Sequence, residues 1–216
     1  KDKNMWGNAQ KMINSALNLC KESSNDDVQK SRCASGVFME LATNFLNGNL
    51  NLSLIKDDPL SVCRKQQEFG KMDCYTQLNG VLNLVGGGKL TESAKFIRDI
   101  DEDKYVIEAI QTLAAPTINI QDSNYIDDIS ACRSLQNRLH LSCIKGLALG
   151  FMLGGTPGKE YEDAINFCKT SDLLEEEKEA CFYLILGHSS KLYSQSEFRG
   201  ICRQVEQRYR QSLCSI

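Results

Sequence analysis

The chain has 216 residues, of which 42% are hydrophobic and 25% are charged, and its formal net charge is −3 at pH 7. This composition suits a folded protein with an apolar core, and the slight negative balance argues against nucleic acid or an anionic membrane as a partner. No apolar run reaches the roughly 18 residues of a membrane span, so we expect no transmembrane segment. The first residues carry no apolar export segment, so for an exported protein we expect this chain to be the mature form.

The ten cysteines fall into five pairs in chain order, and the members of each pair are 11 to 13 residues apart. An even count fits either five disulfides in an oxidising compartment or thiolate metal ligands in a reducing one. No CxxC occurs, although zinc ribbons and thioredoxin-like sites need that close spacing. The near-constant gap therefore favours bonds between sequence neighbours: Cys20 with Cys33, Cys63 with Cys74, Cys132 with Cys143, Cys168 with Cys181, and Cys202 with Cys214.

A first helical hairpin is expected at residues 4–47. Apolar residues stand three, four and seven positions before Cys20, which is the spacing of one helix face. The apolar run ASGVFMELA, which begins at Ala34, suits a second helix that is buried on more than one side. The Asn- and Leu-rich stretch at residues 46–58 is interpreted as an insertion before the next hairpin.

The second hairpin is expected at residues 57–85, and the glycine triplet at residues 86–88 is interpreted as the turn that follows it. The third unit, at residues 90–116, contains no cysteine. Ile97 and Ala109 stand twelve residues apart where the pair would be. We therefore expect an apolar contact to replace the bond.

The last three hairpins are expected at residues 123–153, 157–189 and 194–216. In the segment NFCKTSDLLEEEKEACF, residues 166–182, a straight helix would hold the two cysteines roughly 20 Å apart, too far for a bond. The chain is therefore expected to turn at residues 170–172 and to return as a second helix. Ser194 and Glu197 have the spacing of a capping box, which marks the start of another helix.

The units repeat with a period of about 35 residues once the insertion is set aside. Periods of this length are typical of stacked helical hairpins, whereas the alternation of apolar and polar residues expected of strands is scarce. The predicted fold is all-α: a right-handed superhelix of about six disulfide-stapled hairpins, with residues 1–216 as one repeat domain.

Paired helices, this period and one disulfide per unit resemble the Sel1-like and tetratricopeptide class of helical repeats, particularly its cysteine-rich exported members. The resemblance is architectural and covers nearly the whole chain. It implies a binding scaffold in an oxidising compartment, and it transfers no catalytic residue.

A basic residue follows the first cysteine of every pair, and also the matching position of the cysteine-free unit. These candidate partner-binding residues are Lys21, Arg64, Arg98, Arg133, Lys169 and Arg203. Stacked repeats would place them in a line that could bind an acidic peptide or another polyanion. The alternative is that each cation only complements the dipole at the end of a helix.

Little in the sequence indicates catalysis. His140 and His188 stand in no metal-ligand or nucleophile spacing, and phosphate-binding loops and HExxH are absent. The acidic clusters at residues 101–103 and 175–177 could bind a cation, but carboxylates at the start of a helix also complement its dipole. Glu40 lies inside an apolar run and is interpreted either as groove-lining or as part of an exposed helix edge. We therefore predict no catalytic residue, no metal site and no cofactor.

The predicted function is that of a non-enzymatic scaffold that binds a protein or peptide in a secreted or periplasmic compartment. No nucleic-acid partner is expected. A surface adhesion protein, and a periplasmic enzyme or a metal-binding protein with cysteine ligands, stay open as alternatives.

Overall fold

The computed structural model describes residues 2–118, 125–210 and 214. Within these ranges the chain forms twelve α-helices and three short 3-10 helices, with no β-strand. The predicted all-α class is therefore confirmed. No helix in the described ranges combines the length and the apolar character needed to cross a membrane.

The chain divides into two compact units, Lys1–Ala109 and Ile110–Ile216, and each is described by itself. The expected single domain, its unit boundaries, the superhelix and its period stay predictions.

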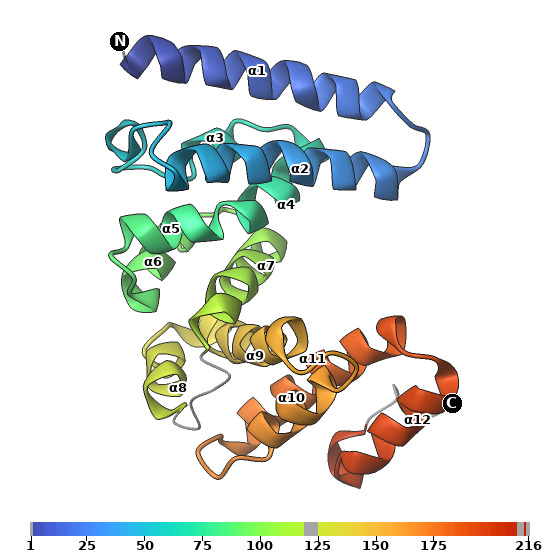
Figure 1. Ribbon diagram of the computed structural model, residues 1–216. Coiled ribbons are helices and arrows are strands. Elements are labelled where there is room, and N and C mark those ends of the chain that lie inside the picture. The colour runs from blue at the N-terminus through green and yellow to red at the C-terminus, as the bar shows by residue number, and fades with distance from the viewer. Residues whose placement is uncertain (1, 119–124, 211–213, 215–216) are drawn as a thin grey trace. The chain divides into compact units, whose positions relative to one another are not determined.

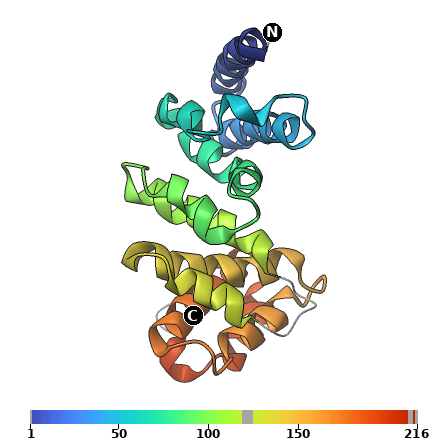
Figure 2. The same cartoon turned by 90° about the vertical axis from the view of Figure 1, so that its left-hand side faces the viewer.

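The first unit begins with two long antiparallel helices and continues with shorter ones (Figure 1). Its elements are α1 (Asp2–Glu22), α2 (Asp27–Leu46), η1 (Leu52–Leu54), α3 (Ser61–Arg64), α4 (Glu68–Gln77), α5 (Asn79–Val85), α6 (Leu90–Ile97) and the start of α7 (Asp103–Ala114). Figure 2 views α1 and α2, in blue, nearly along their axes.

Helix α2 is the centre of the first unit, because it packs against α1, α4 and α5. It begins at an Asp26 cap, whose carboxylate accepts a hydrogen bond from the Val28 backbone N–H at 2.8 Å. Phe38 and Phe45 on its inner face are fully buried. The Trp6 ring of α1 meets Phe45 edge-on, with ring centroids 5.5 Å apart. The apolar spacing before Cys20 thus produces the expected face between α1 and α2.

Close packing in the first unit also depends on a break inside α4. Gly70 has φ of +78°, a conformation that side chains with a Cβ rarely adopt. A Cβ at this position would stand 3.3 Å from the Leu17 side chain of α1 and 3.5 Å from Phe38. Glycine therefore allows the start of α4 to approach the α1–α2 hairpin.

In the second unit, most of the helices pack against one central helix, α9. Its elements are the end of α7, η2 (Ala115–Thr117), α8 (Ile126–Arg133), α9 (Asn137–Gly154), α10 (Glu160–Cys168), α11 (Glu175–Leu192), α12 (Gln195–Gln204) and η3 (Gln207–Tyr209). Helix α9 contacts α8, α10, α11 and η2 (Figure 1). The Phe151 ring of α9 stacks on Phe167 of α10, and Tyr125 meets both rings edge-on.

Two glycines one helical turn apart bring α9 against the end of α7 and η2. A Cβ at Gly146 would stand 2.5 Å from the Gln111 carbonyl oxygen and 2.7 Å from the Ala114 Cβ. A Cβ at Gly150 would stand 2.3 Å from the Ala115 carbonyl oxygen. Real Cβ atoms do not come so close to backbone, so this helix contact needs glycine at both positions.

Five disulfides join the ten cysteines, and they connect the sequence neighbours that the spacing favours. Four of them clamp a pair of helices near its turn, and the fifth joins α12 to Cys214. Helix α10 ends at Cys168 and α11 begins at Glu175, so the turn lies where the segment at residues 166–182 predicts it. The capping box of Ser194 and Glu197 is also present at the start of α12.

The cysteine-free unit corresponds to α6 and α7. Ile97 and Ala109 are both buried in the first unit. A direct contact between them in place of a bond stays a prediction.

Candidate partner-binding groove

An apolar groove runs along the α1–α2 hairpin. Its walls come from one face of each helix, because the lining residues recur at intervals of three and four: Ala9, Met12, Ile13 and Ala16 of α1, and Cys33, Gly36, Val37, Glu40, Leu41 and Asn44 of α2, with Asn49 and Leu50 from the segment after α2. Its volume of about 680 Å³ lies within the range of ligand-binding clefts in proteins. The same period that makes the two helices amphipathic therefore also shapes this groove.

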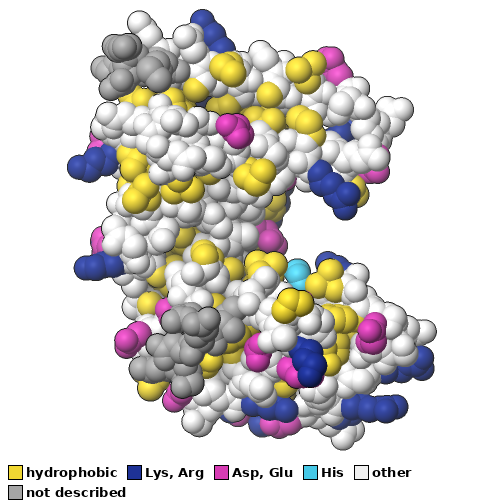
Figure 3. Space-filling view, viewed as in Figure 1, with side chains coloured by type: hydrophobic (Ala, Val, Ile, Leu, Met, Phe, Trp, Pro, Cys, Tyr) yellow, Lys and Arg dark blue, Asp and Glu magenta, His cyan; other side chains and the backbone are white. Residues whose placement is uncertain are grey.

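The groove leaves large apolar side chains in contact with water. Met12 in its wall is 72% exposed, and Met39, the neighbour of Glu40 on α2, is 58% exposed. Figure 3 shows hydrophobic side chains gathered over α1 and α2, at the top of the view. Exposed apolar side chains that gather on one face of a protein are typical of interaction surfaces.

Gly36 forms a gap in the α2 wall. A Cβ added there would meet no atom within 4 Å, so the space above this position is open. A larger side chain at position 36 can therefore project into the groove without disturbing the helix that carries it.

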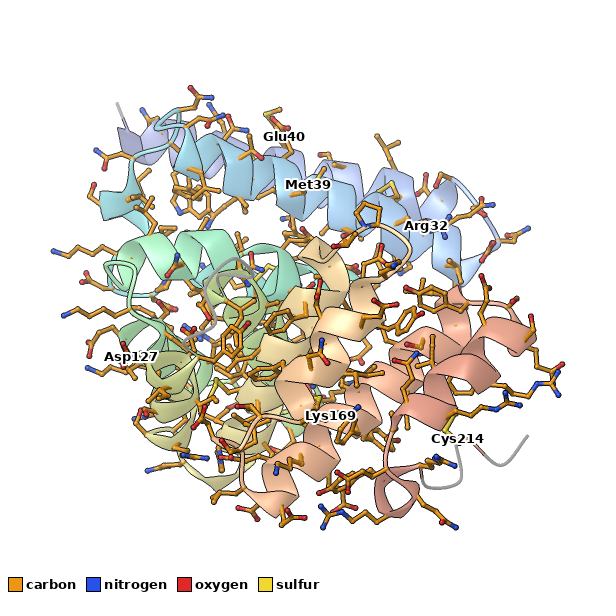
Figure 4. The ribbon with its side chains drawn as sticks, turned by 60° about the horizontal axis from the view of Figure 1, so that its bottom comes forward. Arg32, Met39, Glu40, Asp127, Lys169 and Cys214 are labelled. Atoms are coloured by element: carbon orange, nitrogen blue, oxygen red, sulfur yellow. A yellow bond between two sulfur atoms is a disulfide. The ribbon has the colours of Figure 1, made fainter. Side chains whose placement is uncertain are left out.

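The polar edge of the groove consists of one carboxylate and two amides. The Asn44 side-chain amide donates a hydrogen bond to Glu40 Oε1 at 2.9 Å, and the Asn49 amide donates one to Asn44 Oδ1 at 3.2 Å. Met39 and Glu40 are labelled on α2 in Figure 4. Glu40 lines this wall and is also exposed, so both interpretations of Glu40 match its position.

One disulfide is exposed to the groove through Cys33. It is exposed and lines the wall, whereas its partner Cys20 is buried. Both members of the Cys63, Cys132 and Cys168 bonds are fully buried. Thiol–disulfide exchange needs access to a sulfur atom, so we expect the Cys20–Cys33 bond to react faster than these three buried bonds.

A mild reductant should therefore open Cys20–Cys33 before the three bonds whose sulfurs are buried. The measurement is brief treatment with a phosphine, alkylation of the released thiols, and peptide mapping over time. Equal labelling rates at Cys33 and at Cys74 would contradict the expectation, because they would show that the whole unit opens before any bond reacts.

The six predicted cations do not share one environment. Lys21, Arg98, Lys169 and Arg203 are exposed, and none of them forms an ion pair with another residue that the structure describes. Lys21 lines a cavity of about 280 Å³ beside Lys65, and Lys169 lines one of about 340 Å³ beside Tyr125 and Phe167. Lys169 is labelled in Figure 4. The partner-binding role of these four residues stays a prediction.

The other two cations are exposed as well, but each is paired with a carboxylate of the chain. Arg64 forms an ion pair with Asp58. Arg133 donates from Nε to Glu177 Oε1 at 2.8 Å and from Nη2 to Glu177 Oε2 at 2.6 Å, and Nη2 also donates to the Asp172 carbonyl oxygen. Arg133 therefore ties the end of α8 to the start of α11.

Glu177 is completely buried at the centre of this cluster. It also accepts hydrogen bonds from the Leu174 backbone N–H at 2.7 Å and from His140 Nε2 at 2.6 Å. Burial by itself would raise the pKa of Glu177, but the hydrogen bonds from Arg133, Leu174 and His140 outweigh it and lower the pKa to about 2. The carboxylate is therefore ionised at neutral pH, and all three donors contribute to keeping it so.

Sequence patterns did not single out Glu177 from its acidic neighbours. Glu175 pairs with Arg208 at 2.7 Å and accepts a hydrogen bond from Tyr209, while Glu176 is exposed. Three adjacent carboxylates thus have three different surroundings. A glutamate three residues after Leu174, at the third position of a helix, was the only local signal for the buried one.

The remaining candidate residues from the sequence are the acidic cluster at residues 101–103 and His188. Glu102, in the other acidic cluster, pairs with Lys71 and Lys104, each at 3.4 Å. Burial, and next the charge of Lys191, lower the pKa of His188. The described ranges contain no group of His, Cys, Asp and Glu side chains arranged to hold a metal ion.

Comparison with known proteins returns no match for this chain, whether to protein-family models, to curated proteins or to solved structures.

Proposed function

We propose that this protein is a non-enzymatic scaffold that binds a protein or peptide partner in the α1–α2 groove. The observation that carries the proposal is the groove itself, an apolar cleft of about 680 Å³ with the exposed Met12 in its wall. A helix of the partner would lay its apolar face between α1 and α2, with anchors at i, i+3, i+4 and i+7.

Five disulfides and the lack of free thiols support an oxidising, secreted or periplasmic compartment. Each bond closes a loop of 11 to 13 residues within the chain. In the chain-entropy model such a loop stabilises a hairpin by roughly 3 kcal/mol. A rigid hairpin loses less conformational freedom when it binds, which favours affinity.

The predicted superhelix of about six hairpins belongs to the same proposal. It is supported by two hydrogen bonds in which a tyrosine hydroxyl donates to the glutamate that begins the second helix of the preceding hairpin, 34 to 37 residues earlier: Tyr105 to Glu68, and Tyr209 to Glu175. A contact that recurs at about one period is what stacking of equivalent units requires. The exposed cations Lys21, Arg98, Lys169 and Arg203 would add contacts to acidic parts of a partner.

Trp6 gives this proposal a direct test. It is the only tryptophan in the sequence, and it lies on α1 and packs on Phe45 of α2, the two helices that form the groove. A synthetic amphipathic helical peptide with leucine at i, i+3, i+4 and i+7, and without aromatic residues, should change Trp6 fluorescence on binding. Gly36→Phe should weaken binding by about tenfold or more, because the ring fills the groove.

Gly36→Ala is the matched control. It adds one methyl group to the same open position, so it should retain binding and stabilise α2 by about 0.5–1 kcal/mol. The proposal is wrong if the peptide does not bind the wild-type protein, or if Gly36→Phe binds it as well as Gly36→Ala does.

A further inference from the structure

Among the described residues that line the α1–α2 groove, Glu40 is the one charged side chain. It stands on the same face of α2 as Val37 and Leu41, one turn after Gly36. Its carboxylate is exposed. A ligand that fills the groove must therefore cover an ionised group as well as apolar surface.

The residues around the groove satisfy only part of the hydrogen-bonding capacity of the Glu40 carboxylate. Oε1 accepts the hydrogen bond from Asn44, whose own oxygen is engaged by Asn49. Within the described part of the chain, Glu40 forms no ion pair. The charge is tolerated in the free protein because water solvates it.

Covering the groove with a purely apolar ligand would remove that water. A carboxylate that loses its solvation without gaining a cation is costly, and the cost would fall on every ligand that brings no positive charge. A lysine or arginine at the edge of the ligand removes the penalty and adds a charge-assisted hydrogen bond. The wall thus discriminates among apolar helices by their charge.

We infer that the occupant of the groove is an amphipathic helix of a partner protein that carries a lysine or arginine beside its apolar face, opposite Glu40. This inference rests on the proposed function of the groove and specifies the chemistry of the partner. The apolar residues supply most of the contact area, and the cation selects the partner and fixes the register of its helix.

The test uses a series of leucine-faced helical peptides that differ only at positions flanking the apolar stripe, where each member carries lysine, glutamine or glutamate. Binding is followed by Trp6 fluorescence at low and at raised salt. The best lysine peptide should bind the wild-type protein about five- to tenfold more tightly than its glutamate counterpart. Salt should reduce the difference, because it screens exposed charges.

Glu40→Lys should reverse the preference, and Glu40→Gln should abolish it while leaving binding of the glutamine peptide unchanged. Glu22→Lys is the control, because Glu22 is an exposed α1 residue outside the groove lining and its replacement changes the net charge equally. Thermal melting of each variant shows whether its fold is retained.

The outcomes separate the two proposals. Equal binding of lysine and glutamate peptides, unaffected by Glu40→Lys, would overturn the inference and leave the groove a docking site. Loss of binding across the whole series would overturn both. Sedimentation of the free protein gives one more readout, because a dimer that Glu40→Lys dissociates would make a second copy of the chain the occupant and also overturn the inference.

Discussion

Arg133→Met should destabilise the second unit by about 2–3 kcal/mol, because it leaves the buried Glu177 carboxylate without its cation, and solvent around the partly exposed Arg133 reduces the effect. Arg203→Met is the matched control. Arg203 also follows a cysteine in the last turn of a helix, but it forms no ion pair with a residue that the structure describes. Its replacement should change stability by no more than about 0.5 kcal/mol.

Hydrogen exchange read out by mass spectrometry on α9 and α11 is the appropriate measurement, because Trp6 lies in the first unit and does not report on the second. The double variant Arg133→Met with Glu177→Met should recover part of the loss, since it removes the orphaned charge together with its partner. Similar protection in Arg133→Met and Arg203→Met would show that the ion pair contributes little.

The same cluster also makes the stability of the second unit depend on pH, and the direction of the effect follows from the pKa of Glu177. The folded-state pKa of Glu177 is about 2, below the ordinary value of 4.5, so the folded state binds a proton less readily than the unfolded state does. The stabilisation is complete above the ordinary value and is lost as the pH falls from there toward 2. In Arg133→Met the acid-dependent loss should be smaller, because a carboxylate without its cation has a higher pKa.

Gly146→Ala and Gly150→Ala should each destabilise the second unit by about 1–3 kcal/mol, and the double variant by more. The added methyl groups would meet the backbone of Gln111 and Ala115, which cannot move aside as a flexible side chain can. Gly187→Ala, in α11, is the control, because a Cβ there meets no atom within 4 Å. It should stabilise that helix by about 0.5–1 kcal/mol.

Urea unfolding followed by circular dichroism would compare the four glycine variants, with hydrogen exchange to assign any change to α9. Equal stability of Gly146→Ala and Gly187→Ala would mean that α9 shifts at little cost, and that its close approach to the end of α7 is not required.

The regular features of this fold could be predicted from the sequence because they depend on short spacings. A gap of 11 to 13 residues between cysteines, together with apolar residues three and four apart, is enough to predict helices paired by a local bond. The turn between Cys168 and Cys181 follows from the length of a helix alone. These predictions needed no information on how one hairpin meets the next.

The individual roles of charged residues could not be predicted in this way. Arg133 and Arg203 follow their cysteines in the same local pattern, yet only Arg133 meets a buried carboxylate, which lies 44 residues further along the chain. The groove could not be predicted either, because it exists only where no other segment of the chain packs over Gly36. Glu40 was the one hint, as a charge inside an otherwise apolar run.

The local closure of every disulfide also affects how the chain would respond to a pulling force. A pulling force can extend only the residues that lie outside the loop closed by a disulfide. Each bond therefore prevents the extension of 11 to 13 residues, or about 40 Å of extended chain. The turns would remain closed while the helices around them unravel. A tethered molecule would thus lengthen less than its 216 residues allow and would keep five closed loops from which to refold.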